Sequence, residues 1–388
     1  MDTSLLTDLS AWERLGGHHT AEEIAQQPAL WNALADALDA AQARIDAFLG
    51  DWLSRPGHRV ILTGAGSSGF IAEMVADAIQ AQWPAADVRA IHTTSLLTHP
   101  ALYLRRESPT LLVSFGRSGS SPESVAAVDL VRDQVAVSRF LDITCNGDGA
   151  LARRGAGRED TLTLLMPPAS CDRAFAMTSS LTCMQLATLA VFDRQPWPQR
   201  LARLRQVADA GQRALDEWEG GIAALAGAAY SRVIYLGSGP LEALAREAAL
   251  KVLELSAGRV LALANTPLGF RHGPKSTLDP DTLVVVLRSH EPLARLYEQD
   301  LLDELRRDGV AGRVLSVGPR RDDGRGEADD FDLDVPAAPD PWLAPVWLTL
   351  AQRYALRRSA ALGLTPDNPF PDGTVNRVVQ GVTLHPHR

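Results

Sequence analysis

The sequence predicts an α/β protein made of two tandem copies of one doubly wound domain. Each copy is expected to hold a mostly parallel five-stranded sheet between two layers of helices. Three observations predict this fold. Short apolar runs alternate with helix-compatible stretches through the first half of the chain. Glycine- and serine-rich loops follow two of these runs. The same pattern then begins again at Arg232.

Length and composition exclude several classes of protein. A chain of 388 residues is too long for one compact core and favours two domains. Its net charge of −9 argues against a nucleic-acid or membrane partner, because either would need a basic surface. The three cysteines form no CxxC pair, so we expect neither a disulfide framework nor a zinc cluster. Without a signal peptide or a transmembrane run, a cytoplasmic location is expected.

The expected domains follow one another along the chain. Residues 1–50 form a helical segment, 51–215 the first domain, and 216–388 the second domain with a C-terminal tail. Thr20 opens a capping-box pattern for an early helix. His18 and His19 are interpreted as a solvated pair, because no carboxylate or cysteine stands at ligand spacing. The charged stretch 320–334 is expected to be a surface loop.

The strands of the first domain are expected near 60–62, 88–91, 111–113, 140–145 and 162–166. After the first strand, Gly64, Gly66 and Gly69 match the GxGxxG spacing of a dinucleotide site. That interpretation also needs an acidic residue after the second strand, where the chain instead reads His-Thr-Thr-Ser. A small anionic ligand, bound by Ser67 and Ser68, is therefore preferred.

The third strand leads into the loop on which the functional prediction depends. Residues 111–124 read LLVSFGRSGSSPES, a strand, a hydroxyl-rich loop and then a helix start at Pro122. Hydroxyls and free N–H groups at a helix N-terminus suit a phosphate, although a plain flexible turn would look the same in isolation. Because ligands bind beyond the carboxyl ends of parallel strands, the two loops are expected to converge on one phosphate.

The second half repeats the first but loses this loop. Residues 232–239 match 59–66, and the strands near 282–287 and 313–318 match those near 110 and 139. Where the first copy has hydroxyls, the second has Arg288-Ser289-His290-Glu291. The copies are therefore not equivalent, and the second is free to supply other groups.

Those groups are expected between residues 250 and 276. Glu247, Lys251 and Glu254 share one helical face, which could be a surface ion pair but is surrounded by leucine and valine. His272 lies in the loop sequence FRHGPKS. The chain has only two lysines, Lys251 and Lys275, so both are notable.

With these motifs in place, the chain resembles the sugar isomerase (SIS) domain family over roughly residues 50–385. FRHGPKS at 270–276 and VNRVVQGV at 375–382 resemble its galactosamine-6-phosphate deaminase/isomerase subgroup, often labelled tagatose-6-phosphate ketose/aldose isomerase. The resemblance implies that Glu254 is the enolisation base and that His272 assists ring opening from a neighbouring subunit. The residues it implies for phosphate binding are Ser67, Ser118 and Ser121, with Gly66, Ser68, Arg117 and Ser120 in the same loops.

Two departures from the isomerase half of glucosamine-6-phosphate synthase stand out. Arg117 replaces a glutamine, and the tail lacks that enzyme's catalytic lysine. Lys251 or Lys275 is expected to compensate, unless no imine to the enzyme is needed.

The resemblance implies an enzyme that converts galactosamine 6-phosphate into tagatose 6-phosphate and ammonia through an enolamine. Aldose–ketose exchange needs one base and one ring-opening acid, so no metal or cofactor is expected. The enzyme is expected to be a homodimer or homotetramer. Glucosamine-6-phosphate deamination, simple ketose/aldose isomerisation and a non-catalytic sugar-phosphate sensor remain as alternatives.

Overall fold

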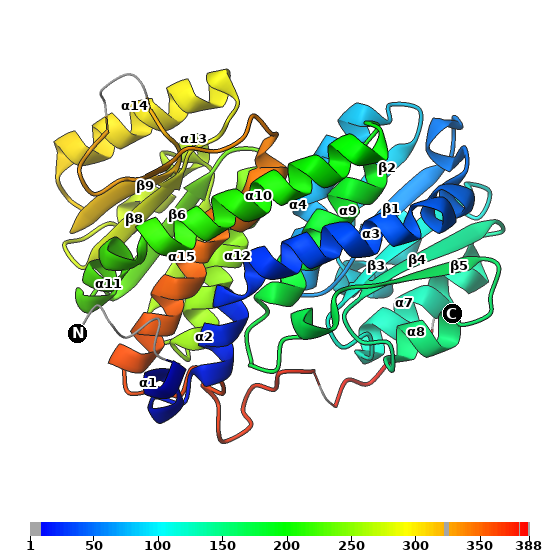
Figure 1. Cartoon of the computed structure of the whole chain (residues 1–388), viewed down its shortest axis with the longest axis horizontal. Coiled ribbons are helices and arrows are strands. Elements are labelled where there is room, and N and C mark those ends of the chain that lie inside the picture. Colours follow the sequence, from blue (N-terminus) through cyan, green and yellow to red (C-terminus); the bar gives the residue numbers. More distant parts are fainter. Residues whose placement is uncertain (1–8, 322–325, 380, 387–388) are drawn as a thin grey trace. The chain divides into compact units, whose positions relative to one another are not determined.

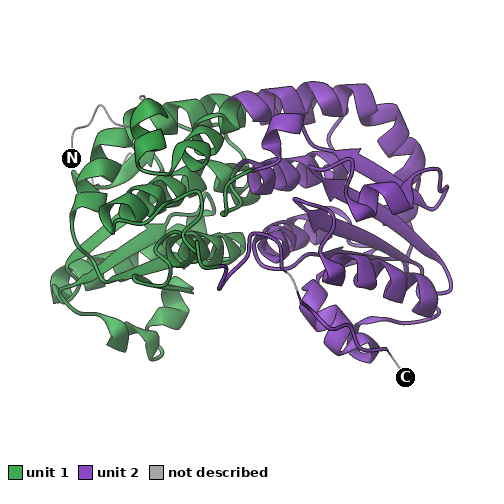
Figure 2. Cartoon of the chain, turned by 90° about the horizontal axis from the view of Figure 1, so that it is seen from below, with its two compact units in different colours: residues 1–28, 173–178, 205–372 green, residues 29–172, 179–204, 373–388 purple. Residues whose placement is uncertain are grey.

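The chain divides into two compact units, and each unit contains one copy of the repeated domain. The computed structural model describes residues 9–321, 326–379 and 381–386. Figure 2 colours the two units separately. Unit 1 comprises residues 1–28, 173–178 and 205–372, and unit 2 comprises residues 29–172, 179–204 and 373–388.

Unit 2 is built on a five-stranded parallel sheet, as the sequence predicts (Figure 1). Its strand order is β2-β1-β3-β4-β5. Every residue of β1 is buried, because helices cover both faces of a parallel sheet. The strands are β1 (Arg59–Thr63), β2 (Asp87–Ala90), β3 (Thr110–Gly116), β4 (Ser138–Thr144) and β5 (Thr161–Leu165).

Helices cover the sheet of unit 2. On one face, Ile61, Leu112 and Phe140 pack against apolar residues of α5, α7 and α8. Alternate residues of the strands point to the other face, where α4 and the wholly buried α9 pack. The helices of this part of the chain are α3 (Gln27–Leu49), η2 (Trp52–Ser54), α4 (Ser67–Gln82), α5 (Thr93–Thr98), α6 (Pro100–Tyr103), α7 (Pro122–Gln134), α8 (Ala150–Gly155), η3 (Pro168–Ser170), α9 (Ser179–Phe192) and α10 (Trp197–Glu217).

Unit 1 repeats the same sheet. Its order, read from the other edge, is β7-β6-β8-β9-β10, and all of its pairs are parallel. Strands β6, β8 and β9 are those that the internal repeat predicted, so the duplicated fold is confirmed. The strands are β6 (Arg232–Gly237), β7 (Leu261–Asn265), β8 (Thr282–Leu287), β9 (Arg313–Pro319) and β10 (Phe331–Leu333).

The helices of unit 1 also form two layers. The core on one face joins Phe270 and Leu301 to Ile234 and Val284 of the strands. Helices α12 and α15 pack on each other, and nearly all of α15 is buried. The helices are α1 (Leu9–Arg14), α2 (His18–Ala25), α11 (Glu219–Gly227), α12 (Pro240–Leu255), α13 (Pro267–Phe270), η4 (Pro274–Thr277), α14 (Pro292–Asp308) and α15 (Asp340–Ala361). No helix among the described residues is long and apolar enough to cross a membrane.

The expected surface loop at 320–334 is wrong at its C-terminal end, because this end contains β10. Phe331 and Leu333 are buried there. The side chain of Asp330 in this stretch is buried and accepts hydrogen bonds from the guanidinium groups of Arg306 and Arg321. A run of charged residues therefore conceals a short core strand.

The units are also divided differently from the contiguous domains expected from the sequence. The first 28 residues group with unit 1, where Asp367 accepts hydrogen bonds from the N–H and hydroxyl of Thr20, both at 2.7 Å. Thr20 does not begin α2, which starts two residues earlier at His18. The tail from Gly373 groups with unit 2.

Candidate functional site

The two predicted phosphate loops start side by side in unit 2. Strands β1 and β3 are parallel neighbours in which Thr63 pairs with Ser114, so both chains leave the sheet at the same edge. Gly66 has a φ of 57°, a left-handed conformation that favours glycine, and helix α4 begins at the next residue. Ser67 and Ser68 thus lie in the first turn of α4, at the positive end of the helix dipole.

The hydroxyls of the second loop have different local tasks. Ser121 is the N-cap of α7, and its Oγ accepts from the Ser124 N–H at 3.3 Å. Ser120 Oγ donates to the Ser118 carbonyl and accepts from the Ala150 N–H at 3.0 Å, which ties the loop to α8. Ser118 Oγ accepts from the Ser120 N–H at 3.3 Å, so its own proton is available to a ligand. Among the three serines of this loop, Ser118 therefore has the hydroxyl that is most available to a ligand.

Two supporting residues were missed by the sequence analysis. Thr144 Oγ1 donates to the Gly116 carbonyl at 2.6 Å, and Asn146 Nδ2 donates to the Ser118 carbonyl at 3.1 Å. A Cβ on Gly119 would lie 2.9 Å from Thr144 Oγ1, so the loop requires glycine there. The available signal was that β4 is the next strand of the sheet, so the loop after β4 adjoins the loop after β3.

Arg117 contacts the C-terminal tail. Its buried guanidinium donates to the Arg377 carbonyl at 2.9 Å. The Arg377 guanidinium in turn donates to the Asp172 carbonyl, and Asp172 accepts from the first N–H groups of α9. The tail was expected to form either an edge strand or a cover. Its described residues form no strand, and residue 377 lies against the phosphate loop.

In unit 1 the equivalent edge of the sheet is closed by carboxylates. The Ser289 N–H, just after β8, donates to Glu298 at 2.9 Å. Asp340 accepts from the Ser289 hydroxyl and, at 2.6 Å, from the His290 N–H. These side chains occupy backbone donors of the kind that a phosphate would use. The second repeat therefore has no equivalent of the open hydroxyl loop.

A buried charge cluster lies on α12 in unit 1. Lys251 Nζ lies 2.6 Å from Glu254 and 3.2 Å from Glu247. The side chains of Lys251 and Glu247 are fully buried, whereas Glu254 keeps 23% of its surface exposed. Burial alone would lower the pKa of Lys251, but the two carboxylates outweigh it and raise the pKa. Lys251 therefore stays cationic, and Glu254 is the accessible member.

His272 lies on a short exposed segment between α13 and η4. Phe270, which is 1% exposed, anchors this segment in the core. Within the described residues, no hydrogen bond joins the His272 side chain to another group. Lys275 is held by Glu304 and by Asp308, the latter at 2.6 Å. The lysine that might have replaced the missing tail residue is thus already paired at the surface.

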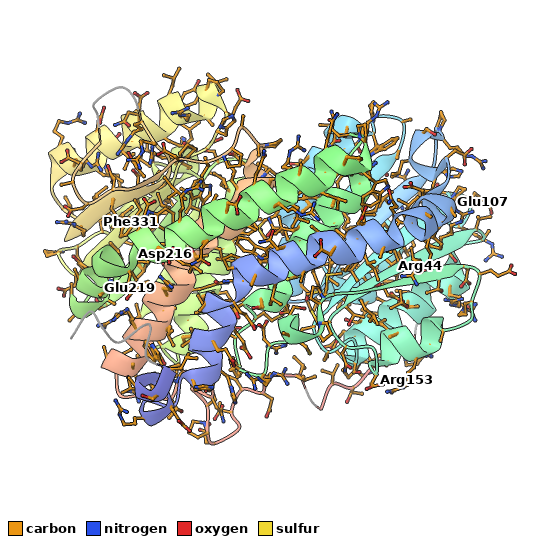
Figure 3. All side chains as sticks on the ribbon, in the orientation of Figure 1. Arg44, Glu107, Arg153, Asp216, Glu219 and Phe331 are labelled. Atoms are coloured by element: carbon orange, nitrogen blue, oxygen red, sulfur yellow. The ribbon has the colours of Figure 1, made fainter. Side chains whose placement is uncertain are left out.

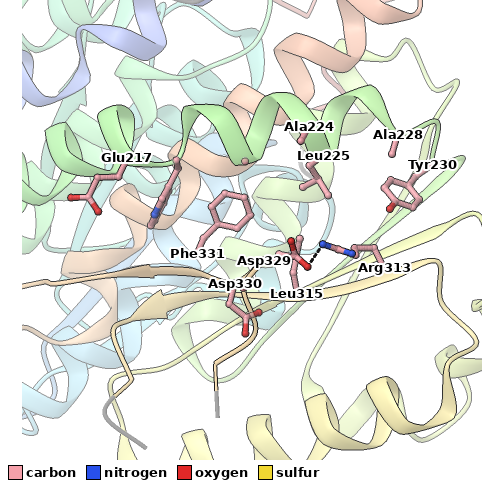
Figure 4. Close-up of a pocket in the computed structure, with 13 residues that line it drawn as sticks. Glu217, Ala224, Leu225, Ala228, Tyr230, Arg313, Leu315, Asp329, Asp330 and Phe331 are labelled. Atoms are coloured by element: carbon pink, nitrogen blue, oxygen red, sulfur yellow. Dashed lines mark ion pairs between the residues drawn. The ribbon is translucent and has the colours of Figure 1, made fainter. Parts of the chain in front are cut away.

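One pocket of unit 1 does not contain the predicted site residues. It has a volume of about 400 Å³ and lies between α11 and strands β9 and β10 (Figure 4). Phe331 forms part of its apolar wall, and the ion pair of Arg313 with Asp329 lies beside it. Figure 3 draws the side chains of the described residues and labels Phe331 in this part of unit 1. None of the predicted site residues lines this pocket.

The histidine pair at the start of α2 has a carboxylate neighbour after all. Ligand atoms of His18, His19 and Glu22 all lie within 4.8 Å of one another. The Glu22 carboxylate is already bound by Arg173, and a helix N-terminus disfavours a cation. The expectation of a pair without carboxylate neighbours is therefore wrong, although the trio is a poor cation site.

Both units thus have a parallel sheet of the same strand order. Unit 2 has the open hydroxyl loop, and unit 1 has the helix α12 with Glu247, Lys251 and Glu254. This combination is that of the sugar isomerase class. The sequence model of the SIS domain matches residues 53–194, within the first repeat.

Whole-length relatives narrow the class. The chain is 42% identical to the D-galactosamine-6-phosphate deaminase AgaS of Shewanella sp. (strain ANA-3), covering 99% of this chain and 96% of that protein. It is 44% identical to an Escherichia coli D-galactosamine-6-phosphate deaminase AgaS, covering 95% and 96%. A crystal structure of tagatose-6-phosphate ketose/aldose isomerase from Escherichia coli matches with a TM-score of 0.86 and 41% identity, covering 95% and 96%. The chain belongs to this AgaS family and is a phosphosugar isomerase/deaminase.

Proposed function

We propose that this enzyme converts galactosamine 6-phosphate and water into tagatose 6-phosphate and ammonia. The observation that carries the proposal is the similarity, over nearly the whole chain, to D-galactosamine-6-phosphate deaminases. The residues expected for this chemistry are divided between the two repeats. Unit 2 has the hydroxyl loop and unit 1 has an accessible carboxylate.

Phosphate binding is proposed for the two loops of unit 2. Ser118 donates its hydroxyl, and the first turn of α4 at Ser67 and Ser68 presents the positive end of the helix dipole. Gly66 lets the chain turn without a side chain at that edge. Ser120 and Ser121 hold the loop in shape, and Arg117 anchors it to the tail. Such a clamp accelerates the reaction mainly by fixing the sugar relative to the base.

Glu254 is proposed to move the proton. In the open-chain sugar it removes the hydrogen at C2, giving an enolamine, and returns a proton to C1. The resulting ketose imine takes up water at C2 and expels ammonia. This sequence balances without any oxidant or reductant. Lys251 acts as a positioning residue, because its ammonium donates a hydrogen bond to the Glu254 carboxylate at 2.6 Å and holds that side chain in place.

His272 is proposed to open the pyranose ring in the site of a neighbouring copy. The supporting observations are its exposure and the apolar surface on the same segment of the chain. Leu261, Leu263 and Leu268 are 47%, 36% and 45% exposed. Exposed leucines on an edge strand and the following short helix suit an interface between copies in a homodimer or homotetramer.

Mixing two inactive variants tests the role of His272. Glu254→Gln and His272→Ala chains are unfolded together, refolded together and assayed. If His272 serves a neighbouring copy, the mixed oligomer regains up to about a quarter of wild-type activity for a dimer, because one of its two sites is then intact in half of the assemblies. Activity no greater than that of the separate variants would contradict this role.

The substrate is tested by following ammonia release from galactosamine 6-phosphate and from glucosamine 6-phosphate. We expect release from the galacto sugar to be at least about tenfold faster, since the epimers differ in one hydroxyl contact. Faster release from the gluco sugar would reassign the substrate. No ammonia from either sugar, with interconversion of tagatose 6-phosphate and its aldose, would replace deamination by simple isomerisation. Binding without any turnover would indicate a sensor.

A further inference from the structure

We propose that the second repeat has an anion site of its own, in a pocket beside the first turns of α14, that takes a phosphate dianion, free or carried on a small metabolite. The pocket has a volume of about 220 Å³ and lies wholly within unit 1. Its wall includes three arginines, which are Arg288, Arg295 and Arg321. The site is distinct from the hydroxyl loop of unit 2 and does not depend on the proposed reaction.

Two of these arginines are buried with hydrogen-bonding capacity to spare. The side chains of Arg288 and Arg321 are each 4% exposed. Arg288 Nε, together with Arg321 Nε and Nη1, is shielded from solvent and finds no acceptor in the described part of the chain. Buried N–H groups are nearly always satisfied, so three such groups at one pocket indicate a missing acceptor.

The charged groups around the pocket are paired unevenly. Asp332 pairs with Arg288 and lies 3.6 Å from Arg321, while Asp330 is shared between Arg306 and Arg321. Arg295 forms no ion pair with any residue that the structure describes. Burial, followed by the charge of Arg321, lowers the pKa of Arg288 to about 10, and Asp332 and Asp330 offset this only in part.

Glu298, whose buried carboxyl lines the same pocket, is a further acidic neighbour, and Asp340 lies beside it. Glu298 accepts the Ser289 N–H at 2.9 Å, and burial raises its pKa to about 7, which leaves its carboxyl partly protonated at neutral pH. Among the described residues, the arginines Arg288, Arg295, Arg306 and Arg321 lie here with Asp330, Asp332, Asp340 and Glu298.

A phosphate dianion suits the unpaired guanidinium N–H groups of Arg288 and Arg321 better than a carboxylate does. It brings two negative charges and several acceptor oxygens, and the planar guanidinium fork binds it in bidentate fashion. The pocket is also larger than the anion alone requires. Leu296, which lines it, is 65% exposed, and Leu293 on the same helix is 60% exposed. These side chains leave room for the organic part of a phosphate monoester.

Equilibrium dialysis with radiolabelled inorganic phosphate tests the site without measuring turnover. Ser118→Ala is used as the background so that binding at the loop of unit 2 is weakened. We expect this chain to retain one phosphate site. Adding Arg295→Glu should weaken the remaining binding at least about tenfold, because a repulsive charge replaces an attractive one. The matched control Arg307→Glu lies on the same helix, is 71% exposed and lines no part of the pocket. Phosphate binding by the Ser118→Ala chain that carries Arg307→Glu should change by less than about twofold.

Two results would overturn the proposal. One is a Ser118→Ala chain that binds no phosphate, and the other is an equal loss of binding with Arg295→Glu and Arg307→Glu. Arg295→Gln provides a second, milder variant if charge reversal impairs folding. A competition arm distinguishes the sources of the dianion. Labelled phosphate is displaced with either fructose 6-phosphate or unlabelled phosphate. If fructose 6-phosphate displaces it at the lower concentration, the natural ligand is a monoester. If unlabelled phosphate does so, the natural ligand is free phosphate.

Discussion

Lys251 and Glu254 form a 2.6 Å ion pair in which the cation is fully buried and the carboxylate is partly exposed. The second carboxylate on Lys251, Glu247, is fully buried at 3.2 Å. The Lys251 ammonium thus pairs with the buried Glu247 carboxylate and also with the partly exposed Glu254 carboxylate. This arrangement keeps the partly exposed Glu254 side chain fixed at the edge of an apolar core on α12.

Replacing the two lysines of the chain should have very different effects on stability. Lys251→Met leaves Glu247 buried without its cation, so we expect a loss of about 3 to 5 kcal/mol in the free energy of unfolding. Lys275→Met removes a surface lysine whose partners, Glu304 and Asp308, are 23% and 33% exposed. The free energy of unfolding should therefore fall by less than about 1 kcal/mol. Urea denaturation of both variants measures this difference. Equal losses would contradict the proposed importance of the buried cluster.

Two serines of the phosphate loop should separate binding from stability. Ser118→Ala removes a hydroxyl that caps no helix, so phosphosugar affinity should fall about tenfold with little change in stability. Ser121→Ala removes the N-cap of α7 and should also cost about 0.5 to 2 kcal/mol of stability. Calorimetric titration and thermal unfolding of both variants measure the two effects. The account fails here if Ser118→Ala binds normally.

Asp142, buried in β4, should make stability depend on pH. Burial raises its pKa to about 7, against the opposing effects of Ser114 and Arg132. Between its ordinary value and about 7 the folded state binds more protons than the unfolded state, so stability falls as pH rises. Asp142→Asn removes this dependence. The stability of this variant relative to wild type should therefore improve by about 2 to 3 kcal/mol between pH 5 and pH 8.

A second aspartate provides the opposite sign as a control. Hydrogen bonding to Arg158 is the first of the causes that hold the pKa of Asp160 below its ordinary value, so its contribution is present at neutral pH and lost in acid. Asp160→Asn should therefore destabilise the protein at pH 8 more than at pH 3. Urea midpoints at each pH measure both effects. A pH-independent difference for Asp142→Asn would refute its assignment as a buried, titrating carboxyl.

The strands and the hydroxyl-rich loop after β3 could be predicted as structural elements because their signals are local. Buried parallel strands appear as short apolar runs, and the loop after β3 contains its own hydroxyls and helix start. The repeat then placed β6, β8 and β9. In each case the residues that define the element are neighbours in sequence.

Other features depend on contacts between distant residues and left no local signal. Asp340 reaches back to Ser289 from α15, and residue 377 of the tail meets Arg117. The strand β10 is concealed by charges whose partners, such as Arg306, lie on another helix. The shared helical face of Lys251 and Glu254 could be predicted from spacing. The complete burial of Lys251 depends instead on the packing of α12 against α15, which is distant in sequence, and against β6 and β7.

The most direct test of the account is the rate of ammonia release from galactosamine 6-phosphate by Glu254→Gln. Glu242→Gln is the matched control, because Glu242 lies on the same helix, is 39% exposed and pairs only with Arg246 among described residues. We predict that Glu254→Gln lowers the rate by about 10² to 10⁴ while phosphosugar binding stays within about threefold, and that Glu242→Gln behaves like wild type. Full ammonia release by Glu254→Gln would contradict the assignment of Glu254 as the base.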